Sequence, residues 1–267
     1  MKKQKILVVA HPDDEILFFS SLLGELDRII ICFGPCSDQS LSKGRERLQR
    51  SFPLKNVEWL NMEEANVYLS VDWKNPRTNA DGLCVDWNSE KYHQNYEYLT
   101  NYLERELEDC AIVYTHNPWG EYGHEDHVSV FNAVLNGIKE GETEMYVSGY
   151  VSGRSENLFK RQQYFLDAEI LLRSVPRKLC AEMKQLYMSH GCWTWNDYYE
   201  WPDIEMFCRI RKGETPGRDH SPERSALRPV MYFTDDFPQG NLKRLAKKML
   251  PAGIQNFIKP IVRKALK

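Results

Sequence analysis

Hydrophobic residues in the first half of the chain form short apolar runs that alternate with longer segments of helical periodicity. The runs have the length and β-branched content of buried strands. They occupy residues 6–9, 28–33, 57–61 and 111–116. Helical spacing is found over residues 15–26, 42–52, 95–108 and 128–138. Because consecutive strand, helix and strand nearly always form a right-handed parallel unit, we predict a Rossmann-like α/β fold, a mostly parallel sheet with helices on both faces.

The rest of the chain is less regular. Residues 145–151 fit a fifth strand and residues 175–189 a further helix. A polar segment over residues 62–90 is expected to form a long loop or lid, since loops of this length inside compact domains are usually functional or mobile. An aromatic-rich part follows from Trp193 to Phe207. Its aromatic rings are expected either to stack on a sugar or to form a small core.

Charge and proline content divide the C-terminal region. The sequence contains no acidic residue after Asp236, whereas Lys and Arg recur there among Leu, Ile, Met and Phe. Such a basic amphipathic pattern fits either a solvated helix or a peripheral contact with an anionic membrane. We expect a domain over residues 1–210, a loop-rich segment over 211–239 and a basic tail over 240–267.

Overall composition restricts the class of protein. The chain of 267 residues is 42% hydrophobic and 27% charged, with a net charge of −3, which gives no reason to expect a nucleic-acid partner. Its seven cysteines are odd in number and scattered, and no secretory signal precedes the first strand. We therefore expect reduced thiols and a cytoplasmic protein, with any membrane contact peripheral and made through residues 240–267. The composition does not set the oligomeric state.

Polar residues with metal-binding chemistry follow the first and fourth predicted strands. His11 and Asp14 come directly after the first strand, and His127 opens the helix after the fourth. These strands are neighbours in the usual doubly wound order, where a crevice opens at their carboxyl ends. Two histidines and one carboxylate are a common ligand set for catalytic zinc. Taken separately, Asp13 and Asp14 could be helix caps, but two such clusters at two strand ends favour a metal site.

A zinc ion held there would lower the pKa of a bound water and polarise a carbonyl group. Asp13, next to a ligand but pointing elsewhere, is placed to accept a proton. His124 would lie near the oxyanion or the leaving amine, and Asp126 could orient an imidazole.

Both clusters closely resemble the motifs of the PIG-L/LmbE-like de-N-acetylases. The resemblance is carried by Ala10-His11-Pro12-Asp13-Asp14-Glu15 and Gly123-His124-Glu125-Asp126-His127, and it covers about the first 150 residues. Those enzymes are zinc-dependent hydrolases that remove acetyl groups from N-acetylglucosamine-type sugars on a Rossmann-like fold. One departure is a glutamate, Glu125, where many members have proline.

The resemblance implies a role for each motif residue. It implies that the ligands of zinc, or of another divalent metal, are His11, Asp14 and His127. Asp13 resembles the general base and His124 the electrostatic or acid residue. Tyr122 resembles a tyrosine that contacts the reacting carbonyl in some members, and Asp126 resembles the partner of a motif histidine.

Substrate contacts are less clearly indicated. Many family members have a basic residue that reaches substrate from the helix after the second strand, and Arg45, Arg47 and Arg50 all qualify here, with Arg45 taken as the candidate. Arg77 in the 62–90 loop and Trp193 are further candidates. We predict removal of the N-acetyl group from an amino sugar, including one on a glycoconjugate or lipid-linked intermediate. The alternatives are deacylation of an antibiotic or thiol-cofactor precursor, and a non-catalytic membrane-surface scaffold.

Overall fold

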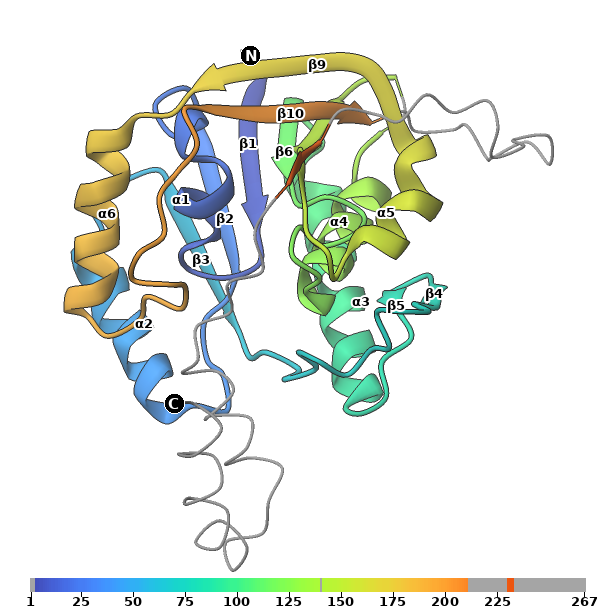
Figure 1. Cartoon of the computed structure of the whole chain (residues 1–267), viewed down its shortest axis with the longest axis horizontal. Coiled ribbons are helices and arrows are strands. Elements are labelled where there is room, and N and C mark those ends of the chain that lie inside the picture. Colours follow the sequence, from blue (N-terminus) through green and yellow to red (C-terminus); the bar gives the residue numbers. More distant parts are fainter. Residues whose placement is uncertain (1–2, 140, 211–229, 233–267) are drawn as a thin grey trace, which may run out of the picture. The chain divides into compact units, whose positions relative to one another are not determined.

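A central sheet of seven strands organises the described part of the chain (Figure 1). The computed structural model describes residues 3–139, 141–210 and 230–232. In spatial order the strands are β3 (Val57–Met62), β2 (Arg28–Phe33), β1 (Gln4–Val9), β6 (Cys110–Thr115), β7 (Glu144–Ser148), β10 (Ile204–Ile210) and β9 (Leu166–Ser174). The first five are parallel, whereas β10 is antiparallel to both neighbours. Residues 194–200 belong to a second compact unit of the chain.

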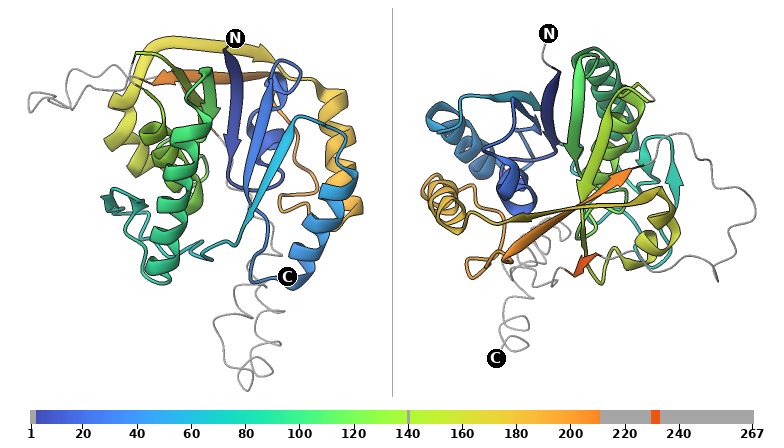
Figure 2. Two further views of the ribbon diagram at one scale, coloured as in Figure 1. Left: turned by 180° about the vertical axis from the view of Figure 1, so that it is seen from behind. Right: turned by 90° about the horizontal axis from the view of Figure 1, so that it is seen from above.

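Helices cover both faces of this sheet. They are α1 (Asp14–Phe18), α2 (Gln39–Ser51), α3 (Ser89–Glu106), α4 (Glu125–Gly137), α5 (Glu156–Gln162) and α6 (Arg177–Ser189). The two views in Figure 2 place α2 and α6 on one side of the parallel strands and α3 and α4 on the other. Because the central strands are covered on both faces, their side chains are apolar without interruption, as in Ile6, Leu7, Val8 and Val9, which are fully buried. The prediction of a Rossmann-like α/β fold is confirmed.

The predicted crossover helix over residues 15–26 is wrong in its length. Helix α1 ends at Phe18, and a short 3₁₀ helix, η1 (Ser20–Leu22), follows. The buried Glu205 carboxylate of β10 accepts both the backbone N–H and the hydroxyl of Ser20 and of Ser21, at 2.5–3.1 Å. These bonds satisfy N–H groups at the start of η1. Their acceptor, Glu205, is 185 positions from Ser20 in the sequence. The apolar periodicity alone therefore did not reveal the break.

Other differences concern short or antiparallel elements. Helix α3 begins at Ser89 rather than at residue 95, and neither β9, β10 nor α5 was predicted. The predicted strand over 145–151 is divided at Gly149, whose N–H donates to the Met206 oxygen at 2.8 Å and whose own oxygen accepts the Met231 N–H at 2.7 Å. The short strand β8 (Tyr150–Val151) then pairs with β11 (Met231–Tyr232).

The long segment after β3 is largely irregular, in agreement with the predicted loop over 62–90. It contains only a small hairpin of β4 (Thr78–Asn79) and β5 (Gly82–Leu83) among its described strands. None of the helices in the described ranges is long and apolar enough to cross a bilayer. The tail over 240–267 and most of the predicted segment over 211–239 lie outside the described residues.

Candidate active site

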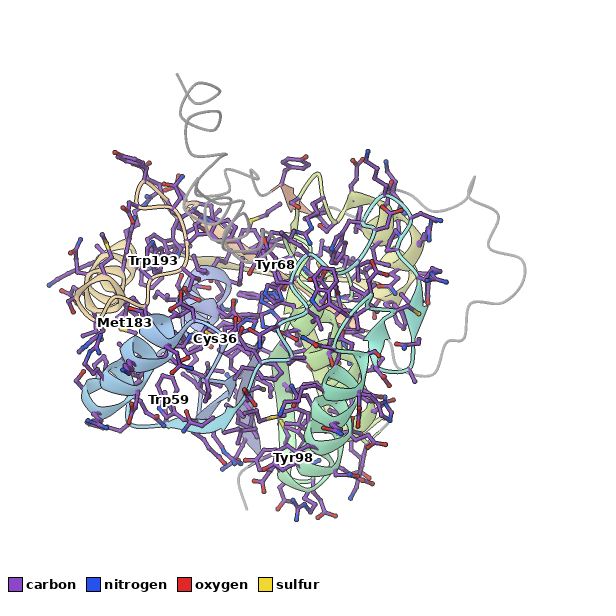
Figure 3. All side chains as sticks on the ribbon, turned by 90° about the horizontal axis from the view of Figure 1, so that it is seen from below. Cys36, Trp59, Tyr68, Tyr98, Met183 and Trp193 are labelled. Carbon is purple, nitrogen blue, oxygen red and sulfur yellow. The ribbon has the colours of Figure 1, made fainter. Side chains whose placement is uncertain are left out.

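The two predicted clusters meet where β1 and β6 lie side by side. The sheet order runs from β1 toward β2 and β3 on one side and from β6 toward β7 on the other, so this pair marks the switch point of the winding. In open α/β sheets ligands bind at the carboxyl ends of strands at such a point. Figure 3 looks onto this edge, with Tyr68 over its middle and Trp193 to one side, near α6.

One oxygen atom of Asp14 lies at the centre of the site. Asp14 Oδ2 is 3.3 Å from His11 Nδ1, 3.3 Å from His127 Nε2 and 3.4 Å from His116 Nε2. It also accepts the backbone N–H of His11 at 2.7 Å. Burial alone would raise the pKa of Asp14, but the surrounding histidines, His127 foremost, hold it well below its usual value. The carboxylate is therefore ionised and surrounded by imidazole nitrogens.

Hydrogen bonds distinguish His127 from His116 as a ligand. His116 Nε2 accepts the Ala10 backbone N–H at 2.9 Å, so its lone pair is used. His127 Nε2 is buried and has no hydrogen-bond partner among the residues described. Donor atoms around tetrahedral zinc, with bonds of about 2.0–2.1 Å, lie about 3.3 Å apart, which is the spacing from His11 and His127 to Asp14. The buried histidines and carboxylates thus fit a divalent metal. Among the residues described, ligand atoms near enough to share one ion come from Asp14, His116 and His127, and from His11, His124 and His127, so each predicted ligand belongs to such a group.

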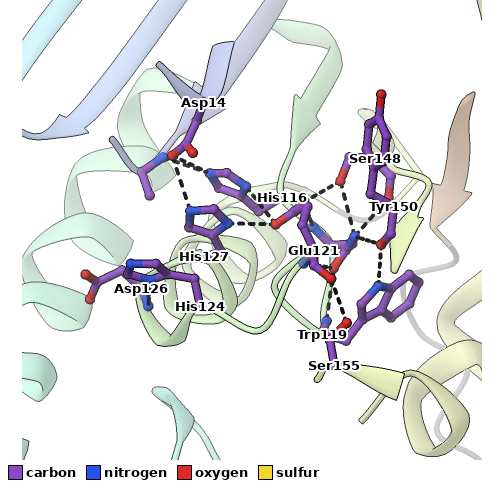
Figure 4. A network of polar contacts seen from close by, with 12 residues as sticks. Asp14, His116, Trp119, Glu121, His124, Asp126, His127, Ser148, Tyr150 and Ser155 are labelled. Carbon is purple, nitrogen blue, oxygen red and sulfur yellow. Dashed lines mark hydrogen bonds and ion pairs between the residues drawn. The ribbon is translucent and has the colours of Figure 1, made fainter. Parts of the chain in front are cut away.

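A buried glutamate fixes the orientation of both His116 and His127 (Figure 4). Glu121 Oε2 lies 2.7 Å from His127 Nδ1 and 3.1 Å from His116 Nδ1. Burial opposes its ionisation, but the two imidazoles lower the pKa of Glu121 to about 2. With the Nδ1 proton of His127 donated to this carboxylate, Nε2 is left as the free donor atom for a metal. The structure therefore adds Glu121 to the predicted set.

His11 has a carboxylate partner of its own. His11 Nε2 lies 3.3 Å from Asp126 Oδ2, on the ring edge opposite the nitrogen that faces Asp14. Asp126 therefore contacts a motif histidine, as the sequence suggests, and that histidine is His11. Glu64 Oε1 lies 3.9 Å from the same nitrogen and pairs with the buried guanidinium of Arg45. Arg45 is thus joined to the site through Glu64.

Asp13 occupies a strained backbone conformation beside these ligands. Its φ and ψ are 100° and −18°, in the left-handed region that non-glycine residues rarely adopt. The residue is only 2% exposed. Its backbone N–H donates to the Tyr187 hydroxyl at 3.0 Å and to Glu15 Oε2 at 3.1 Å. Strain of this kind is concentrated at active sites.

His124 lies against the other imidazoles with its Nε2 proton available. Its Nδ1 accepts the Asp126 backbone N–H at 3.2 Å, so the neutral ring carries its proton on Nε2. Burial holds the pKa of His124 well below its usual value. A neutral imidazole in this position can donate a hydrogen bond to a developing oxyanion. The ring of Tyr122 lies 5.8 Å from that of His124.

The long loop is fastened to the site by Glu125. Its Oε1 accepts the Val71 N–H at 3.2 Å and the Trp73 indole N–H at 3.3 Å. Tyr68, from the same loop, stacks on His124 with a centroid separation of 4.7 Å. The loop therefore forms a wall of the site, a function that its polar composition did not specify.

Two predicted substrate residues remain, Arg77 and Trp193. Arg77 is exposed at the start of the β4–β5 hairpin. The Trp193 ring packs against Tyr187 and Trp201, with centroid distances of 6.3 and 6.1 Å, as in the predicted small core. Of the residues not predicted, Glu121 and His116 follow the strand that leads to His127, so their place after β6 was the available signal.

Together, fold and site define a Rossmann-like protein with a candidate metal centre of two histidines and one aspartate at its switch point. Residues 6–138 match the model of the PIG-L family, described as GlcNAc-PI de-N-acetylase. The chain belongs to this family by that region.

Individual relatives are distant. The uncharacterized protein L374 of Acanthamoeba polyphaga mimivirus is 26% identical over 136 residues, which is 48% of this chain and 55% of that protein. The chain thus spans about half the length of this curated relative. The zinc-inhibited form of teicoplanin deacetylase Orf2 has a TM-score of 0.52 at 11% identity, covering 79% of this chain and 99% of that one. This likeness supports the fold. The A40926 pseudoaglycone deacetylase Dbv21 has a TM-score of 0.43 at 12% identity, covering 80% and 100%.

Proposed function

We propose that the protein is a metal-dependent de-N-acetylase that hydrolyses the N-acetyl group of an N-acetylglucosamine-type amino sugar. The observation that carries the proposal is the arrangement around Asp14. Its Oδ2 atom lies 3.3 Å from His11 Nδ1 and from His127 Nε2, and the second nitrogen is buried with no hydrogen-bond partner among the residues described. The strained Asp13 stands beside them. The family match supports removal of an N-acyl group. Zinc is the metal we propose, held by His11, Asp14 and His127.

In this mechanism the protein's own residues move the protons. Bound zinc would polarise the amide carbonyl and make an attacking water more acidic. Asp13 takes a proton from that water as its oxygen adds to the carbonyl carbon, and the Nε2–H of His124 donates to the developing oxyanion. When the C–N bond breaks, the proton is returned to the nitrogen, so the products are acetate and a free amine. We propose that Tyr122, whose ring centroid lies 5.8 Å from that of His124, contacts the same carbonyl.

Neighbouring carboxylates keep the imidazoles in these orientations. Asp126 faces His11 Nε2, and Glu121 faces His127 Nδ1. Each ligand histidine therefore directs its other nitrogen toward Asp14, so the site is preorganised. These intact groups argue against the non-catalytic scaffold.

The substrate class can be tested directly. Purified protein, loaded with zinc, would be incubated with free, nucleotide-linked and lipid-linked N-acetylhexosamines, and both acetate and amine would be measured. We expect equal amounts of the two products from at least one of these sugars. Turnover of N-acylated non-sugar amides alone would favour the alternative deacylase, and no zinc uptake under replete conditions would contradict the metal-dependent mechanism.

We also propose that the protein is cytoplasmic and that residues 240–267 bring it to anionic membranes. The support is the basic amphipathic sequence of this region, in which each Lys or Arg near a membrane surface adds about 1 kcal/mol of attraction. Cosedimentation with phosphatidylserine vesicles would compare the full chain with a version ending at Gln239. Equal binding of the two would refute the proposed role of the tail.

A further inference from the structure

A buried tyrosine from α6 contacts the segment that carries the proposed base. The hydroxyl of Tyr187 donates to Glu15 Oε1 at 2.5 Å and accepts the backbone N–H of Asp13 at 3.0 Å. Glu15 Oε2 accepts the same N–H at 3.1 Å. Tyr187 and Glu15 are both fully buried. The three groups therefore form a closed triangle beneath the Asp13 backbone.

This triangle acts on the strained peptide. A left-handed conformation costs a residue other than glycine about 1–2 kcal/mol, so an unrestrained Asp13 would tend to return to negative φ. Such a change would rotate the Asp13 side chain. Two acceptors on the Asp13 N–H fix the plane of its preceding peptide bond, and the Tyr187–Glu15 bond fixes the acceptors relative to each other.

We infer that Tyr187, acting through its contacts with Glu15 and the Asp13 N–H, is a positioning residue for the base. The inference rests on the proposed function, in which Asp13 accepts the proton. Tyr187 lies beyond residues 6–138, so the family match does not cover it. The C-terminal half of the chain thereby completes a catalytic geometry that the N-terminal motif begins.

The test replaces Tyr187 with Phe, which removes the hydroxyl but keeps the ring that packs on Phe52 and Trp193. A misplacement of about 1 Å can cost about 100-fold in rate, so we expect kcat to fall by about 10- to 100-fold on the best substrate of the N-acetylhexosamine panel. KM and zinc affinity should stay within about threefold, because the ligands keep their own partners. Tyr96→Phe is the matched control. Tyr96 is a buried tyrosine of α3, and the substitution removes a hydroxyl that accepts a hydrogen bond from Asn136 Nδ2 at 2.6 Å. Its kcat should equal that of the wild type.

A second measurement does not depend on turnover. In the zinc-loaded protein the hydrogen-exchange rate of the Asp13 amide, followed by NMR, should rise about tenfold in Tyr187→Phe and stay unchanged in Tyr96→Phe. A wild type that releases no acetate would refute the proposed function, and the exchange rate would still decide whether Tyr187 holds this backbone. Unchanged kcat in Tyr187→Phe, an unchanged exchange rate, or a loss of zinc affinity as large as the loss of kcat would each overturn the positioning role.

Discussion

Glu121→Gln is the sharpest test of the metal site. It replaces one carboxylate oxygen by an amide N–H₂ group in a residue that contacts two of the site's histidines. Glu121 Oε2 lies 2.7 and 3.1 Å from the Nδ1 atoms of His127 and His116, while Oε1 accepts the Asn117 N–H at 3.0 Å and the Ser148 hydroxyl. Glutamine offers only one acceptor oxygen. Either the two imidazoles or the two donors on the other side must face an amide N–H₂.

The expected magnitude follows from this loss. Removing the carboxylate partner of a ligand histidine typically weakens metal affinity by about 10- to 100-fold, which corresponds to about 1.4–2.7 kcal/mol. Zinc affinity would be measured by competition with a chromophoric chelator at constant pH. The unfolding free energy of the metal-free variant would be measured in parallel, since a buried amide in place of a carboxylate also disturbs the fold.

Glu205→Gln provides the matched control. Glu205 is also a fully buried glutamate, and it accepts four hydrogen bonds from Ser20 and Ser21. We expect this variant to lose about 1–3 kcal/mol of stability with unchanged zinc affinity. If Glu121→Gln binds zinc as tightly as the wild type, or if both variants lose the same affinity, the assignment of Glu121 as the partner of a ligand histidine is wrong.

Three further predictions use other parts of the structure. Asp13→Asn should keep zinc but lose about 10²–10⁴-fold in kcat, and Asp13→Gly, which relieves the positive φ, should be equally inactive without a lower melting temperature. Glu125→Pro places at the first position of α4 a residue that this position accepts, so the fold should persist while limited proteolysis cuts faster within residues 62–90; unchanged cleavage would show that Glu125 does not hold the loop. Burial raises the pKa of Glu58, but Tyr102 and Arg28 lower it overall from 4.5. The stability that these two contacts contribute is therefore present above pH 4.5 and is lost as the pH falls through the folded-state pKa of Glu58. Arg28→Met should therefore flatten the acid limb of stability measured by urea unfolding, and an unaltered limb would contradict this reasoning.

The parallel half of the fold could be predicted because its strands are buried on both faces. Residues such as Val8 and Ile30 are apolar with no polar alternation, and the helices between them keep a regular period. Strands β9 and β10 lack that signal. β9 is an edge strand with exposed positions, and β10 includes Glu205, a buried charge whose partners are 184–185 residues away.

The candidate site divides in the same way. His11, Asp14 and His127 lie in compact motifs at strand ends, so residue type and position were sufficient to propose them. Glu121 stands in a glycine-containing loop, where a glutamate is usually solvated, and only the folding of two histidines around it reveals its burial. Tyr187 is 174 residues from Asp13, and no local pattern indicates that contact. Orienting groups from distant segments are the part of a site that sequence motifs do not contain.

Charge balance in the buried site leads to a prediction about metal removal. Asp13, Asp14, Glu121 and Asp126 are each at most 2% exposed, so the fold confines several carboxylates in one region. Uncompensated buried charge is costly, and a divalent cation bound only to the native state would offset part of that cost. Linkage then requires that free zinc at 100 times its Kd raise the unfolding free energy by about 2.7 kcal/mol. Thermal unfolding with buffered zinc should show this increase in the wild type and a smaller one in Glu121→Gln at the same free zinc. If saturating zinc leaves the wild-type melting temperature unchanged, zinc does not bind preferentially to the native site, and the ligand set proposed from Asp14 must be abandoned.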